Sequence, residues 1–194
     1  GVRMPDFLLV NDDDLAYAKI RIDERSLAAV QAAPTGFTDS LPQALVLGAM
    51  WDMTRDAQLP APDFVRFVLE CLPAEKDSTL VRVLLSQVES ATRFYTSPAH
   101  RPELAALVAH RLRALAESAE PGSDAQLQFV TAFAGWARSV EDLDLVEGLL
   151  EGSRELPGLA VDTEMRWTLL TSLAVGGRAN EERIDAERRR DDTA

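Results

Sequence analysis

The chain has 194 residues, 46% of them hydrophobic and 27% charged, a composition that can bury a globular core and does not favour disorder. Its formal net charge of −12 argues against nucleic acid and anionic membranes as partners, because both carry negative charge. The lone cysteine, Cys71, cannot form an internal disulfide, and no apolar run reaches the roughly 18 residues of a membrane span, so we expect a cytoplasmic protein.

The first part of the chain predicts a β-hairpin. Residues 7–10 are an apolar run, residues 11–14 are turn formers, and residues 17–23 alternate over their second half, where Ile20 and Ile22 share one face. Two strands alone are only marginally stable. We therefore expect residues 1–23 to complete a sheet whose other strands lie upstream of Gly1.

From residue 24 onward the apolar residues follow a helical period. Helices are predicted over residues 24–33, 40–58, 63–72, 78–95, 102–115, 124–136, 141–150 and 163–174. Four candidate N-caps follow one another at intervals of roughly 40 residues, the repeat length of HEAT and armadillo arrays: Asp39, Asp77, Ser123 and Asp162. The predicted fold class is mainly α, a HEAT- or armadillo-like α-α superhelix of antiparallel helix hairpins.

The charged tail, residues 180–194, is typical of the start of one more helix. Ile184 is its main apolar anchor in the sequence, and Arg188 to Arg190 form a basic run balanced by glutamates, as on a solvated helix face. Because its packing partner is expected to be missing, this helix is expected to be poorly supported. We expect the helical region, residues 24–194, to continue beyond Ala194.

The sequence predicts no catalytic, cofactor-binding or metal-binding residue. His100 and His110 are ten residues apart and no H-E-x-x-H is present, so two imidazoles do not converge on a metal at helical spacing. Cys71 lies among leucines on an apolar helix, which predicts a buried, inert thiol. The acidic run at residues 12–14 lacks the glycine and distal glutamate of a calcium loop, so we interpret it as a solvated turn.

Three tryptophans, Trp51, Trp136 and Trp167, occupy similar places in successive predicted helix pairs. Core packing is the simpler interpretation, because a buried indole contributes a large apolar area. A peptide-binding groove lined by the three rings is the alternative, since helical arrays bind along their concave face.

Several segments resemble the aminopeptidase N family of zinc aminopeptidases, which includes the endoplasmic-reticulum aminopeptidases. The run LLVN at residues 8–11, followed by Tyr17, Lys19, Ile20 and Asp23, is similar to the junction where a small β-sandwich leads into the C-terminal helical domain. The runs LPQA at 41–44, WDMTRD at 51–56, PGSD at 121–124 and VDTEMRW at 161–167 resemble the bacterial branch, particularly actinobacterial enzymes.

The resemblance implies a parent enzyme that removes N-terminal residues from peptides. Its Zn²⁺ would be held upstream by H-E-x-x-H and a later glutamate, so this segment would hold no cofactor and be inactive alone. Residues 1–23 would end an upstream β-sandwich, and residues 24–194 would be the C-terminal helical-repeat domain that walls the substrate chamber. The implied partners are the catalytic domain of the same chain and peptide substrates.

Arginines are the candidates for contact with peptide in such a chamber, because a guanidinium grips a carboxylate: Arg55, Arg82, Arg111 and Arg166. A second interpretation stays open, in which the chain is a freestanding helical-repeat scaffold for protein–protein interaction. The unpaired strands expected before residue 24 argue against it, because a complete array caps its ends with polar helices.

Overall fold

The computed structural model describes residues 4–37 and 39–191, which are mainly helical, as predicted. The chain divides into two compact units, Gly1–Leu104 and Ala105–Ala194. In the described part of the chain, no helix has the length and apolar character needed to cross a membrane.

A turn closed by one side chain begins the first unit. Asn11 has a left-handed φ of 59° and precedes the short 3₁₀-helix η1 (Asp12–Asp14). Its amide nitrogen donates to the Ala16 carbonyl and its amide oxygen accepts from the Ala16 N–H, both at 2.8 Å. The predicted turn is therefore present, but residues 4–37 contain no strand, so the predicted hairpin is not formed. The Asn11 amide satisfies the Ala16 groups that a ladder would otherwise use.

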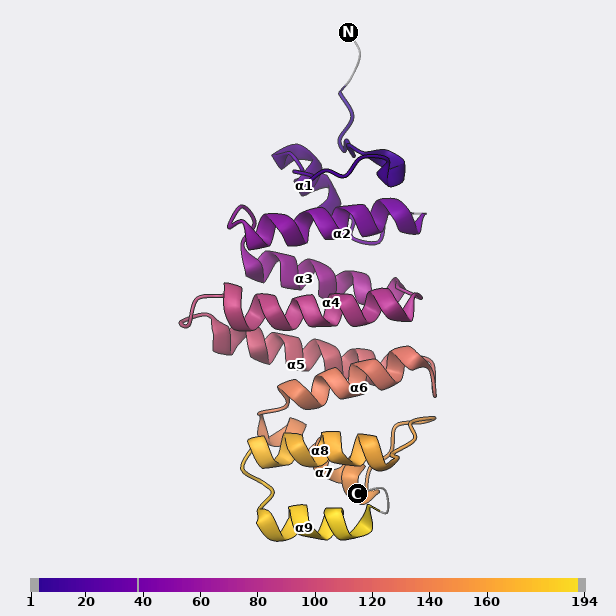
Figure 1. Cartoon of the computed structure of the whole chain (residues 1–194), viewed down its shortest axis with the longest axis vertical. Coiled ribbons are helices and arrows are strands. Elements are labelled where there is room, and N and C mark those ends of the chain that lie inside the picture. The colour runs from indigo at the N-terminus through magenta and orange to yellow at the C-terminus, as the bar shows by residue number, and fades with distance from the viewer. Residues whose placement is uncertain (1–3, 38, 192–194) are drawn as a thin grey trace. The chain divides into compact units, whose positions relative to one another are not determined.

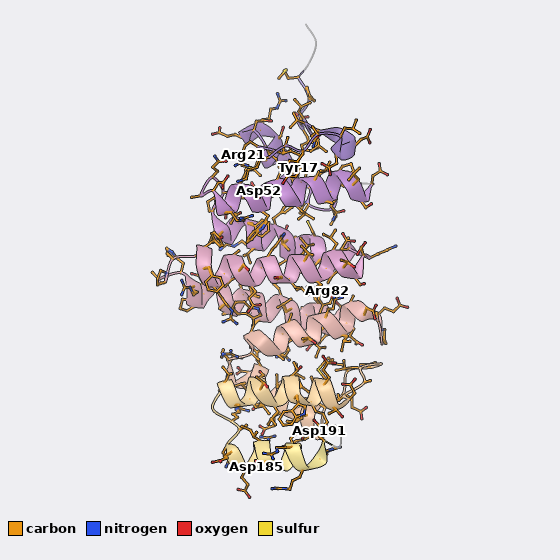
Figure 2. The ribbon with its side chains drawn as sticks, viewed as in Figure 1. Tyr17, Arg21, Asp52, Arg82, Asp185 and Asp191 are labelled. Atoms are coloured by element: carbon orange, nitrogen blue, oxygen red, sulfur yellow. The ribbon has the colours of Figure 1, made fainter. Side chains whose placement is uncertain are left out.

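Residues 17–23 nevertheless keep the predicted alternation. Ile20 and Ile22 are buried, at 8% and 7% exposure, whereas Tyr17 is fully exposed. Lys19 and Arg21 both pair with Asp56, which ties this extended segment to the residue that follows α2. Figure 2 labels Tyr17 and Arg21 on this segment, next to α2.

The first unit is built from short helices. They are α1 (Glu24–Ala32), α2 (Ser40–Arg55), α3 (Ala61–Cys71), the 3₁₀-helix η2 (Leu72–Ala74), α4 (Ser78–Ser90), the π-helical turn η3 (Ala91–Tyr95) and the beginning of α5 (Arg101–Ser118). Helix α3 lies against both α2 and α4 (Figure 1), and its Phe64 and Val68 are fully buried. The apolar stripe of α3 therefore forms the centre of this core.

Two predicted N-caps of the first unit behave differently. The Asp77 carboxylate accepts from the backbone N–H groups of Thr79 and Leu80, at 2.8 and 3.0 Å, and caps α4 as predicted. Asp39 occupies the N-cap position of α2 but its side chain makes no cap hydrogen bond. A cap carboxylate bonds the second or third helical N–H, and the third residue here is Pro42, which has none. Asp39 is therefore at the predicted cap position of α2 but does not make the expected side-chain bond.

The second unit holds the rest of α5 followed by α6 (Asp124–Trp136), α7 (Val140–Glu151), α8 (Thr163–Val175) and α9 (Glu181–Arg190). Helix α8 packs against α6 and α7, and the Ser172 hydroxyl donates to the Ala134 carbonyl of α6 at 2.6 Å. The predicted caps are confirmed: Ser123 accepts from the Gln126 N–H, and Asp162 accepts from the Met165 N–H.

The α7–α8 loop, residues 152–162, is braced against the turn before α6. Gly158 has a φ of 78°, and a Cβ placed there would lie 2.3 Å from the Gly122 nitrogen. Gln126 is buried and joins the two segments: its amide oxygen accepts from the Gly122 N–H at 2.8 Å, and its amide nitrogen donates to the Pro157 carbonyl at 3.1 Å. The loop is therefore fixed at the position where it borders the groove described below.

The last helix is supported differently from the prediction. Ile184, the expected apolar anchor, is 38% exposed, and Glu187 is the buried residue of α9. The charged side chains that hold this helix come from α7 and α8, far away in sequence. Its support is therefore polar, and the expectation that Ile184 anchors it was wrong.

Candidate functional site

The histidines form no site with other ligands. His100 is exposed, and its Nδ1 lies 2.9 Å from the Ser97 hydroxyl, while His110 is exposed on α5. Among residues 4–37 and 39–191, no three histidine, cysteine, aspartate or glutamate side chains gather in a way that could hold a metal ion. The residues described here therefore do not fit a zinc site, which needs three or four converging ligands.

Cys71 is the buried thiol that the sequence predicted. It is fully buried at the end of α3 and donates to the Pro34 carbonyl at 3.4 Å. Burial, with a smaller contribution from Glu70 and Glu75, raises the pKa of the Cys71 thiol to about 12. Because the thiolate is the nucleophile, this cysteine is inert at neutral pH.

The tryptophans do not share one environment. Trp51 is half-buried and packs between the rings of the buried Phe64 and the exposed Tyr95, with centroid distances of 5.4 and 5.7 Å, so it lies at the border of the core. Trp167 is half-buried and uses its indole nitrogen to donate to the Asp191 carboxylate at 2.7 Å. Its polar edge therefore links α8 to the residue that follows α9.

The candidate arginines also differ in what they contact. Arg55 is exposed and lies 3.7 Å from Asp52, its neighbour on α2. Arg82 is exposed on α4 (Figure 2) and forms no ion pair in the described residues. Arg111 is half-buried on α5. Arg166 already holds a carboxylate of its own chain, so of these four Arg82 presents the most available guanidinium.

A groove of about 830 Å³ lies in the second unit, bordered by the end of α7, the α7–α8 loop, α8 and α9. Leucines supply its apolar lining: Leu149, Leu150, Leu156, Leu159 and Leu170. Charged side chains of both signs surround them, among them Arg154, Arg166, Arg183, Glu187 and Arg190. An apolar lining with a charged rim can hold a segment of chain, but it presents no nucleophile.

Arg166 and Glu187 form the central charge pair of this groove. Arg166 Nε lies 2.5 Å from Glu187 Oε1 and Nη2 lies 2.6 Å from Oε2, while Nη1 donates to the Leu150 carbonyl at 2.8 Å. The Arg166 guanidinium lowers the pKa of Glu187, and the Glu187 carboxylate raises that of Arg166. Three guanidinium nitrogens are thus used within the chain, which sequence reasoning on Arg166 did not foresee.

Three acidic residues of α7 pair with two arginines that follow α8 in the sequence. Arg178 lies 2.5 Å from Asp144 and 3.4 Å from Glu147, and Arg183 lies 2.5 Å from Glu147 and 2.9 Å from Glu151. Sequence reasoning missed this network. Its signal was available, because the three acids recur at helical spacing on one face of α7 and two arginines follow α8 five residues apart.

The comparisons with known proteins agree with one another. Residues 7–194 match the family model described as the ERAP1-like C-terminal domain. Aminopeptidase N of Streptomyces lividans is 45% identical over 194 residues, which is all of this chain and 23% of that protein. The chain therefore spans less than a quarter of this relative.

Proposed function

Because the chain belongs to the ERAP1-like C-terminal domain family, we propose that it is the non-catalytic C-terminal part of an aminopeptidase. The observation that carries this proposal is the 45% identity to an aminopeptidase N along the whole of this chain. The described residues are compatible with this proposal, because the Cys71 thiol is buried and no cluster of metal ligands is found among them.

We assign zinc and peptide hydrolysis to the remainder of the parent protein. In this proposal an upstream catalytic domain of the same chain binds Zn²⁺ and removes N-terminal residues from peptides. The helical domain is the wall of the substrate chamber and limits which peptides enter. We also propose a cytoplasmic location, which the single buried thiol of Cys71 supports.

We further propose that the helices continue a HEAT-like superhelix and that residues 1–23 complete a sheet of the upstream β-sandwich. Exposed apolar side chains before α1 support the second part: Leu8 is 60% exposed, Leu15 87% and Tyr17 113%. Apolar groups so exposed at one end of a chain are suited to burial against a neighbouring domain.

The test compares three proteins: the complete parent enzyme, its part upstream of residue 24, and this chain alone. We expect this chain to hydrolyse no aminoacyl amide and to bind no stoichiometric zinc by metal analysis. We expect the upstream part to cleave an aminoacyl amide but to lose the parent's dependence on peptide length.

Chelator-sensitive zinc or hydrolysis in this chain alone would disprove the assignment of a non-catalytic part. An upstream part that keeps the parent's full length dependence would disprove the chamber-wall role alone. An Arg82→Ala variant of the parent, matched with Arg55→Ala, then asks whether the Arg82 guanidinium contacts peptide, because Arg55 pairs with Asp52 whereas Arg82 forms no ion pair within the described residues.

A further inference from the structure

Helix α9 has almost no apolar face. Among its ten residues Glu187 is buried, whereas Ile184 is 38% exposed and Arg188 to Arg190 are exposed. Its neighbour α8 buries Met165, three leucines and Ser172. Most helices dock through an apolar stripe, because burial of that stripe supplies most of their stability. Helix α9 must therefore be held by something else.

Charged side chains join α9 to its neighbours. Arg183 pairs with Glu147 and Glu151 of α7, at 2.5 and 2.9 Å. The Glu187 carboxylate accepts two hydrogen bonds from the Arg166 guanidinium of α8. These pairs are unequal in exposure: the Arg183 and Glu151 side chains are 26% and 57% exposed, whereas those of Arg166 and Glu187 are 16% and 9% exposed.

Exposed charge pairs weaken as salt rises, because counterions screen the attraction over about 10 Å at 0.1 M and about 3 Å at 1 M. Burial of leucines in α8 does not weaken in sodium chloride in this way. The docking of α9 and the packing of α8 therefore respond to salt differently.

We propose that α9 is a salt-labile latch on the groove of the second unit. Screening of the exposed Arg183 pairs favours its opening as one helix, while α7 and α8 stay packed. Arg183, Ala186, Glu187 and Arg190 line the groove from α9, so opening removes one wall of the groove that Leu150 and Leu170 also line.

The test is hydrogen exchange of the whole chain, followed by mass spectrometry on peptides that separate α9 from α8. Between about 0.05 M and about 1 M NaCl we expect α9 amides to exchange on the order of tenfold faster relative to α8 amides. Unchanged exchange in α9, or equal acceleration in α7 and α8, would overturn the proposal.

Glu147→Gln removes the carboxylate shared by Arg178 and Arg183. We expect this variant to exchange faster in α9 at low salt and to respond less to added salt, with α8 amides reporting that the unit is folded. The matched control is Glu117→Gln, which removes the same charge from an exposed pair with Arg113 on α5.

The control should leave exchange in α9 unchanged. If both substitutions accelerate α9 equally, the effect belongs to net charge and the latch is refuted. If Glu147→Gln does not fold, Glu151→Gln takes its place, because Glu151 contacts Arg183 from a more exposed position. If α9 exchanges at the wild-type rate in both Glu147→Gln and Glu151→Gln, the proposal is also refuted.

Discussion

Arg166 and Glu187 lie 21 positions apart in sequence and meet in a two-point fork, with nitrogen–oxygen distances of 2.5 and 2.6 Å. The fork joins α8, a helix with a leucine core, to α9, a helix with almost none. Arg166 also holds the Leu150 carbonyl near the end of α7. One guanidinium therefore fixes three helices around the groove.

The fork makes the second unit sensitive to acid. The Arg166 guanidinium lowers the pKa of Glu187 from 4.5, while burial and, to a smaller extent, Asp191 oppose the shift and Arg190 supports it. Because the folded pKa lies below the unfolded pKa, this stabilisation is complete above the unfolded value and is lost as pH falls through the folded one. We expect the free energy of unfolding of wild type to exceed that of Glu187→Gln by an amount that is constant above about pH 6 and shrinks below about pH 4.

Urea unfolding at a series of pH values, read by circular dichroism, measures this difference. Subtracting the variant removes the titration of the other carboxylates, which both proteins share. A difference between wild type and Glu187→Gln that stays the same down to pH 3 would show that Arg166 does not favour the charged form of Glu187.

The two aspartates before α2 and α4 provide a matched test of helix capping. Asp77→Ala removes a carboxylate that accepts from two N–H groups, so it should lower the free energy of unfolding by about 1 kcal/mol. Asp39→Ala removes a side chain that makes no cap bond, so its effect should be close to zero. Equal losses in the two variants, measured by urea unfolding, would contradict the assigned geometry.

The helices were predictable because their signals are local. Asp77, Ser123 and Asp162 each cap the helix that starts at the next residue, and the apolar period lies within each helix. The support of α9 was not predictable in the same way, because Glu147 and Arg166 reach Arg183 and Glu187 from 36 and 21 residues away. Local reasoning therefore chose Ile184, the one large apolar residue of α9, and missed the ion pairs.

The hairpin failed for a related reason. Its alternation is real, since Ile20 and Ile22 are buried, but a strand needs a paired backbone as well as a pattern. The candidate site shows the same limit: the pattern identified Arg166 as a residue that grips a carboxylate, but only the fold shows that the carboxylate is Glu187 of the same chain.

Cys71 should resist alkylation in the folded protein. Burial raises the pKa of its thiol from 9.0 to about 12, so the thiolate is scarce at neutral pH and the sulfur is shielded from reagent. We expect no alkylation by iodoacetamide at pH 8 in buffer and complete alkylation in urea, followed by mass spectrometry of the intact chain.

The same shift predicts a loss of stability in alkali. Because the pKa of Cys71 is higher in the folded state, its contribution to the free energy of unfolding is complete below pH 9 and is lost as pH rises through about 12.

Rapid alkylation of the folded chain at pH 8 would contradict the alkylation prediction, because it would mean that the Cys71 sulfur is open to solvent.

Gly158 and Gly152 separate backbone strain from steric contact in the α7–α8 loop. Both have left-handed φ angles, 78° and 73°, so alanine is strained by about 1 kcal/mol at each position. A Cβ at Gly152 meets nothing within 4 Å, whereas at Gly158 it would lie 2.3 Å from the Gly122 nitrogen. Gly158→Ala should therefore force the loop away from the turn before α6 and lower the free energy of unfolding by about 3 kcal/mol, against about 1 kcal/mol for Gly152→Ala. Urea unfolding of both variants checks the ranking, and a smaller loss at Gly158 than at Gly152 would show that the loop does not rest on Gly122.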